Sequence, residues 1–187
     1  MLNMISCRIL VLGDSAVGKT ALITTFCQDD FIRVYDPTDA PGKLYQTRRI
    51  IDKIPCIVEI FESSGQDVHY AFRDERIRES DAIVLVYSIT NRSTFHSIYR
   101  FRERISQIRP NNLPIILVGN KCDRSFERQV PLEELIITAK ELQVDWIESS
   151  VWTMVNVERV FFILVRIVHS QEKRRAKRAR TSKCEIL

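Results

Sequence analysis

A glycine-rich segment near the N-terminus constrains the fold of this chain most strongly. Residues 13–20 read Gly-Asp-Ser-Ala-Val-Gly-Lys-Thr and match the pattern G-x-x-x-x-G-K-[ST] at every fixed position. The segment follows the apolar run 9–12 and precedes the helix-compatible run 21–26, so it joins a buried strand to a helix. Backbone N–H groups of such a loop and the helix N-terminus form a cradle for phosphate oxygens. The sequence therefore predicts a phosphate-binding loop, and this context argues against a chance glycine-rich turn.

Each residue of this loop is a candidate contact for a nucleotide. Lys19 is expected at the β- and γ-phosphates, and the hydroxyl of Thr20 is expected to coordinate Mg²⁺. The other candidates come from the loop and the first turn of the helix that follows: Gly13, Asp14, Ser15, Ala16, Val17, Gly18 and Ala21.

Apolar runs alternate with amphipathic stretches along the rest of the chain. The pattern predicts strands at 7–12, 44–52, 55–61, 82–88, 114–120 and 145–149, and helices at 19–28, 67–79, 93–108, 132–142 and 154–169. Such alternation is typical of a mostly parallel sheet with helices on both faces. The strands at 44–52 and 55–61 are close enough to form a hairpin, which makes one edge strand antiparallel. We therefore expect an α/β, phosphate-loop NTPase fold with a six-stranded, mostly parallel sheet.

Positive charge is concentrated at the C-terminus. The 187 residues carry a formal net charge of +4, and residues 171–187 contribute +5 of it from seven Lys/Arg and two Glu, which leaves −1 for residues 1–170. We expect one domain over 1–170 and a disordered polybasic tail over 171–187, since so charged a segment buries little apolar surface. Five cysteines without C-x-x-C spacing argue against a disulfide framework and a zinc site, and favour a reducing compartment.

A second motif, Asn120-Lys121-Cys122-Asp123, directly follows the apolar run 115–119. The carboxylate of Asp123 can accept two hydrogen bonds from the N1–H and the exocyclic amine of guanine, a pair that adenine does not offer. Asn120 and Lys121 can brace the loop and cover the base. Alone, the motif could be an ordinary turn, but a phosphate loop 100 residues upstream makes it a strong signal for guanine.

Together these motifs make the chain resemble a Ras-type small GTPase from about residue 5 to the C-terminus. The resemblance implies that the chain binds GTP or GDP with Mg²⁺ and hydrolyses GTP slowly as a switch. Thr38 resembles the threonine of the first switch segment, which holds Mg²⁺ and the γ-phosphate. Phe31 falls where the family has an aromatic side chain that packs against guanine.

The segment 61–66, Phe-Glu-Ser-Ser-Gly-Gln, resembles the family's D-T-A-G-Q at the start of the second switch. The resemblance implies that the backbone N–H of Gly65 binds the γ-phosphate, that Gln66 orients the attacking water, and that Glu62 takes the place of the metal-binding aspartate. With Thr20 and Thr38, Glu62 completes the implied metal set. The implied catalytic set is Lys19, Thr38, Gly65 and Gln66.

The segment 148–152, Glu-Ser-Ser-Val-Trp, resembles the E-T-S-A-K loop that contacts guanine through backbone N–H groups. The resemblance therefore implies base contacts from Ser150, Val151 and Trp152. It also implies partner proteins of three kinds, namely an exchange factor, an activating protein and effectors, and no nucleic acid is expected.

Three departures from the Ras pattern lie at the nucleotide. Glu62 places its carboxylate one methylene further out than aspartate, so we expect weaker Mg²⁺ binding. Ser15 and Ala16 replace two glycines and crowd the space near the γ-phosphate, where an activating arginine would enter. Val151 and Trp152 replace alanine and lysine, which predicts faster nucleotide release, although the tryptophan could cover the base.

A fourth departure is a longer first switch. The spacing from Thr38 to Tyr45 exceeds that of the Ras pattern, and residues 39–43 replace a short acidic stretch. Asp39 is the only carboxylate left there, and Lys43 reverses the local charge. Because like charges disfavour a basic partner, we expect typical Ras effectors to bind poorly.

Residues 184–187, Cys-Glu-Ile-Leu, form a C-a-a-X box whose final leucine favours geranylgeranylation of Cys184. One lipid chain anchors only weakly, and the basic tail supplies the second contribution. A nuclear localisation signal is the alternative interpretation of residues 173–178, and the two can coexist. We expect the protein at the cytoplasmic face of the plasma membrane, with a cytosolic or nuclear fraction.

The sequence thus predicts a membrane-anchored GTP/GDP switch with slow hydrolysis. One alternative is a GTP-loaded interaction module that does not cycle. Another is an adaptor whose basic tail binds anionic lipid or nucleic acid while the nucleotide site is only structural.

Overall fold

The computed structural model describes residues 4–27, 32–34, 42–63, 70–110 and 113–184. These residues contain a seven-stranded sheet in the order β2-β3-β4-β1-β5-β6-β7. The strands are Ile5–Leu12 (β1), Ile32–Val34 (β2), Gly42–Ile51 (β3), Ile54–Ser63 (β4), Ala82–Ser88 (β5), Ile115–Asn120 (β6) and Asp145–Ser149 (β7). The helices are Lys19–Phe26 (α1), Tyr70–Glu79 (α2), Arg92–Ile108 (α3), Leu132–Leu142 (α4) and Val157–Cys184 (α5), with a 3₁₀ helix at Cys122–Glu127 (η2).

The sheet is mostly parallel, as predicted. β1 pairs in parallel with β4 and β5, and β6 pairs in parallel with β5 and β7. β3 pairs antiparallel with β4 through the expected hairpin. All six predicted strands form, but a seventh was missed: β2 pairs antiparallel with β3 and takes the edge position. The prediction that the antiparallel strand lies at the edge was therefore wrong, because three residues of β2 are too few for a pattern to reveal.

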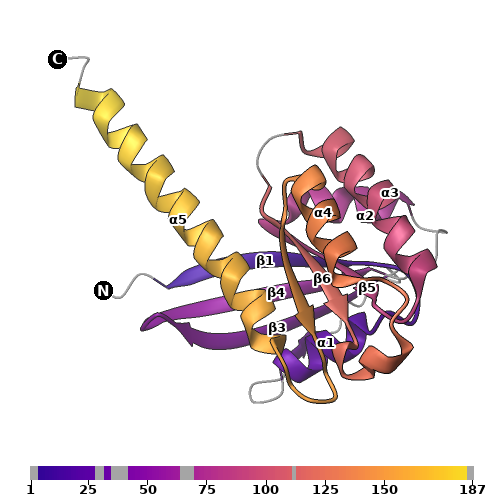
Figure 1. The fold of residues 1–187 in the computed structure, drawn as a ribbon. Coiled ribbons are helices and arrows are strands. Elements are labelled where there is room, and N and C mark those ends of the chain that lie inside the picture. The colour runs from indigo at the N-terminus through magenta and orange to yellow at the C-terminus, as the bar shows by residue number, and fades with distance from the viewer. Residues whose placement is uncertain (1–3, 28–31, 35–41, 64–69, 111–112, 185–187) are drawn as a thin grey trace.

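Helices cover both faces of the sheet, as predicted (Figure 1). Successive residues of β1 point to opposite faces, so Ile9 and Val11 enter one core cluster while Leu10 and Leu12 enter the other. The first cluster packs under α1 and α5, and the second packs under α2, α3 and α4. This burial on both sides explains why residues 9–12 of β1 and the strands β5 and β6 read as continuous apolar runs.

The C-terminal helix is longer than predicted. An apolar stripe of α5 is buried from Val157 to Val168, within the predicted helix, but the helix continues to Cys184 and projects from the body (yellow in Figure 1). The expectation of disorder over residues 171–187 was thus wrong for 171–184, where lysine, arginine, alanine and glutamate favour helix even without packing. None of the helices in the described ranges has the length and apolarity needed to span a membrane.

Candidate functional site

The glycine-rich loop lies between β1 and α1 and is closely packed against β6. Gly18 has φ of 98°, a left-handed conformation that favours glycine. A Cβ atom at this position would overlap the side-chain nitrogen of Asn120, at the end of β6. The fixed glycine of the motif is thus required by a close approach between two segments far apart in the sequence. Ala16 adopts φ of 61° in the same loop, although it carries a Cβ.

Lys19 is buried inside this loop. Its Nζ atom donates to the carbonyl oxygens of Gly13 and Asp14 at 2.9 and 2.8 Å. Burial lowers the pKa of Lys19, and the nearby carboxylates of Glu62 and Asp14 oppose that shift. The Asp14 carboxylate also lies 3.7 Å from Arg100 of α3. The loop therefore fixes the lysine ammonium in the place where phosphates are expected.

Thr20 and Glu62 meet directly beside Lys19. The Thr20 hydroxyl donates to Oε1 of Glu62, and the Tyr45 hydroxyl donates to Oε2 at 2.9 Å. Mg²⁺ prefers oxygen ligands and is bound through one or two carboxylates together with phosphates and water. The residues present fit this ion, with Thr20 and Glu62 as its holders. Within the described ranges, His, Cys, Asp and Glu side chains form no group of three that could hold a metal ion.

Asn120 and Lys121 brace a loop, as predicted, and the loop that they contact is the phosphate loop. Asn120, 2% exposed, donates from Nδ2 to the carbonyl oxygen of Val17 at 2.9 Å. Lys121 donates from Nζ to the carbonyl oxygen of Ala16 at 2.8 Å. In return, the hydroxyl of Ser149 donates to Oδ1 of Asn120 at 3.2 Å, across the register pair that joins β6 to β7. These contacts connect the base-side and phosphate-side segments into one site.

Asp123 is held by the loop after β7. The buried Ser150 donates its hydroxyl to Oδ1 of Asp123 at 2.6 Å, which leaves Oδ2 for a ligand. The backbone N–H of Ser150 donates to the carbonyl oxygen of Val155 at 3.0 Å. Ser150 therefore positions Asp123, and its own backbone N–H is bonded inside the loop, while the predicted base contacts of this segment stay predictions. Trp152, next in the loop after Val151, is 86% exposed.

Four predicted site residues lie outside the described ranges: Phe31, Thr38, Gly65 and Gln66. Their roles stay predictions. Conversely, the site prediction missed Tyr45 and Ser149, which contact Glu62 and Asn120. Ser149 lies within the predicted base-contacting segment, whereas the signal for Tyr45 was only its position on a strand paired with the strand of its partner.

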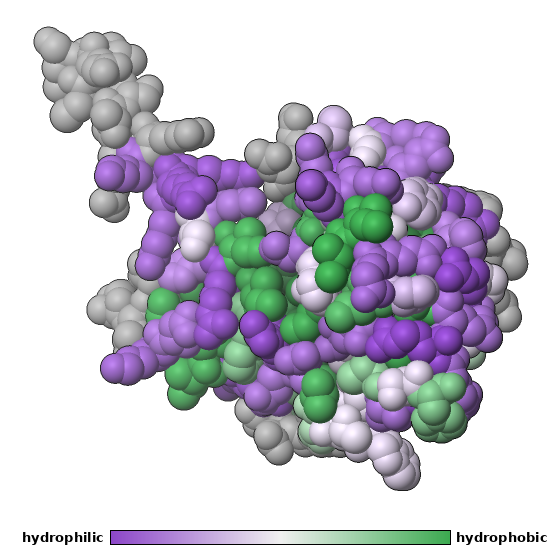
Figure 2. All heavy atoms as spheres, in the orientation of Figure 1, coloured by the Kyte–Doolittle hydropathy of each residue, from purple (hydrophilic) through white to green (hydrophobic). Residues whose placement is uncertain are grey.

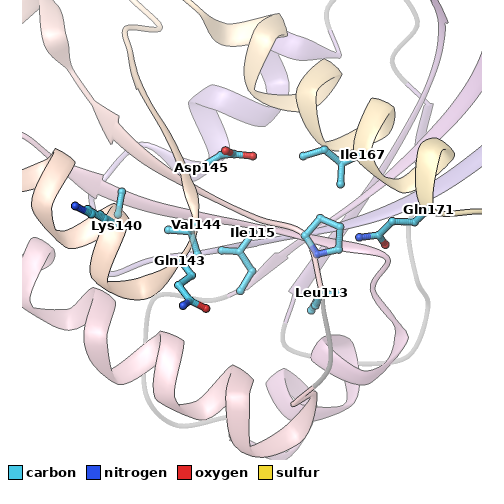
Figure 3. A pocket seen from close by; sticks show the side chains of 10 residues that line it. Leu113, Ile115, Lys140, Gln143, Val144, Asp145, Ile167 and Gln171 are labelled. Carbon is cyan, nitrogen blue, oxygen red and sulfur yellow. The ribbon is translucent and has the colours of Figure 1, made fainter. Parts of the chain in front are cut away.

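A cavity of about 370 Å³ lies elsewhere, between α4 and α5 at the starts of β6 and β7 (Figure 3). Hydrophobic side chains gather on the face that Figure 2 shows. The nucleotide motifs follow the carboxyl ends of the strands, where ligands of parallel sheets bind. This cavity is at the amino ends of the strands, on the other side of the sheet from the nucleotide motifs, and does not belong to the candidate site.

Comparison with models of protein families matches residues 8–170 to the Ras family. Ras-like protein 1 of Pyricularia oryzae is 36% identical over 185 residues, which cover 89% of this chain and 76% of that protein. Ras-related protein Ral-a of Drosophila melanogaster is 34% identical over 166 residues, which cover 88% of this chain and 82% of that protein. With its phosphate loop braced by Asn120 and Lys121, the chain belongs to the Ras family of small GTPases.

Proposed function

We propose that this chain is a membrane-anchored GTP/GDP switch that hydrolyses GTP slowly and signals through its switch segments. The observation that carries the nucleotide part is the pair of hydrogen bonds from Asn120 and Lys121 to the phosphate loop. They bring Asp123, a guanine-reading carboxylate, into the same site as Lys19. One ligand with a guanine at one end and phosphates at the other fits this arrangement.

The chain's own residues supply positioning and charge. Lys19 is fixed by two carbonyl oxygens and offers its ammonium to the β- and γ-phosphates. Thr20 and Glu62 would hold Mg²⁺, which when bound neutralises charge that develops on the phosphates during transfer. In this proposal Gly65 binds the γ-phosphate, and Gln66 orients the attacking water. GTP would order the two switches through Thr38 and Gly65, and hydrolysis would release them.

Membrane attachment is the second part of the proposal. The C-a-a-X box supplies a lipid on Cys184, and the basic residues before it supply attraction to anionic lipid. Lys173, Arg174, Arg175 and Lys177 are exposed on the projecting part of α5. We propose the cytoplasmic face of the plasma membrane as the location, with exchange factors, activating proteins and effectors as partners.

Single-turnover hydrolysis tests the switch. We expect purified protein to carry guanine nucleotide and to convert loaded [γ-³²P]GTP on the order of 10⁻⁴ s⁻¹, the intrinsic rate of Ras itself. Gln66→Leu should abolish conversion and retain GTP binding, because the water loses its orienting amide. Retained GTP without conversion in the parent would favour the non-cycling interaction module. Purified protein that binds no guanine nucleotide would contradict both.

A further inference from the structure

We infer that Tyr45 is a positioning residue for the metal site: its phenol holds the Glu62 carboxylate against Thr20 and thereby sets how much Mg²⁺ the protein needs to retain nucleotide. The inference rests on the proposed function and concerns regulation of the same site. It links β3, the strand that follows the first switch, to a residue that would hold Mg²⁺.

The register of the hairpin brings the two side chains together. Tyr45 of β3 is paired with Ile60 of β4, and Glu62 lies two residues further along β4 on the same face. Such diagonal neighbours are within reach of aromatic and long side chains. The phenol reaches Oε2 at 2.9 Å, and α1 supplies Thr20 to Oε1 from the other side. Three elements of the fold thus converge on one carboxylate.

The longer side chain of Glu62, compared with aspartate, makes the hydrogen bond from Tyr45 necessary. Glutamate has one more rotatable bond than aspartate, so more rotamer freedom must be lost to fix its carboxylate. Glu62 is 9% exposed and Tyr45 is 2% exposed, so water has little access to replace a lost donor. With a donor on each oxygen, the carboxylate is held in one orientation.

This orientation suits a cation at Thr20. Because the Thr20 hydroxyl gives its proton to Glu62, its oxygen lone pairs remain for another partner. Hydrogen-bond partners behind metal-binding groups typically change metal affinity about 10- to 100-fold when they are removed. Loss of the phenol should therefore weaken Mg²⁺ binding and leave the base contacts of Asp123 intact.

Release of fluorescently labelled GDP across a Mg²⁺ titration tests the inference. We expect Tyr45→Phe to raise the Mg²⁺ concentration for half-maximal retention about tenfold. Its release rate in excess EDTA should match that of the parent. Tyr99→Phe is the matched control: this phenol also contacts a carboxylate, Glu141 at 3.2 Å, but lies between α3 and α4. It should leave the Mg²⁺ midpoint unchanged.

A double variant separates positioning from packing. In the Glu62→Asp background the shorter side chain cannot span both donors, so adding Tyr45→Phe should not shift the midpoint further. An unchanged midpoint in Tyr45→Phe with normal GDP binding would overturn the inference alone. An equal shift in both backgrounds would also overturn it, since Tyr45 would then act independently of Glu62. Absence of GDP binding in the parent would instead refute the proposed function, and with it the inference.

Discussion

Gly18 lies where the phosphate side and the base side of the site pack against each other. Its left-handed φ turns the loop into α1, and its missing Cβ leaves room for the amide of Asn120. That amide in turn bonds the carbonyl oxygen of Val17. One glycine therefore serves both the turn and the joining of two motifs, which explains why the pattern allows no other residue there.

Gly18→Ala should weaken GDP binding at least tenfold, because the new methyl group displaces Asn120 from the loop. A left-handed alanine costs about 1–2 kcal/mol, and a disrupted hydrogen bond adds about 1 kcal/mol, so the free energy of unfolding should fall by a similar sum. Equilibrium denaturation and GDP titration measure the two effects.

Ala16→Gly is the control within the same loop: it adds no atom and relieves a positive φ, so binding should persist. Parental affinity in Gly18→Ala would refute the packing argument.

For the helices and strands, the pattern of apolar residues predicted which segments are buried in the core. The buried strands β1, β5 and β6 are apolar runs because both faces are covered, and the stripe on α5 from Val157 to Val168 marks its contact with the sheet. Motif spacing likewise predicted that Asn120 and Lys121 brace the loop.

The missed features depend on information that local patterns lack. The edge strand β2 spans three residues and is defined by its pairing with β3. The contact of Tyr45 with Glu62 depends on strand register, and the support of Asn120 by Ser149 depends on which strands are neighbours. High charge without apolar periodicity predicts disorder at the end of the chain, whereas the same lysine and arginine residues also favour helix and extend α5 to Cys184.

Hydrogen exchange on the full-length protein tests the long helix. Amides of residues 172–182 should exchange roughly tenfold more slowly than in an unstructured peptide, since they are bonded along the helix. Residues 157–168, which pack on the sheet, should be protected far more and serve as an internal reference. Ala176→Pro should remove the protection around it, because proline costs about 3 kcal/mol inside a helix. Unstructured exchange rates across 172–182 in the parent would show that α5 ends at the body.

Across the whole molecule, the body is nearly neutral and the projecting C-terminal segment is basic. Residues 1–170 carry −1 and residues 171–187 carry +5. On the projecting part of α5 the described side chains from 172 to 177 are exposed, and this part ends at Cys184. A lipid on that cysteine would place the basic residues next to the membrane and the nucleotide site away from it.

Cys184→Ser should make the protein mainly soluble, because the basic segment alone cannot replace the lipid, and a nuclear fraction should rise. Each lysine or arginine near an anionic leaflet contributes about 1 kcal/mol, so neutralising five of them with the lipid retained should move the protein to internal membranes. The five are Lys173, Arg174, Arg175, Lys177 and Arg178. Microscopy with cell fractionation measures both. Full membrane retention of Cys184→Ser would show that the C-a-a-X box is not the anchor.

In the proposed function, one site reads guanine through Asp123 and holds phosphates at Lys19. Competition between GTP and XTP for the Asp123→Asn variant tests this pairing of base and phosphate recognition. The carboxamide still has an oxygen for Ser150, but it donates where the carboxylate accepted, so GTP affinity should fall by about 1.5–3 kcal/mol while XTP becomes the preferred ligand. Asp145→Asn, exposed at the opposite end of β7, should leave the preference unchanged. Unchanged GTP preference in Asp123→Asn would contradict the account.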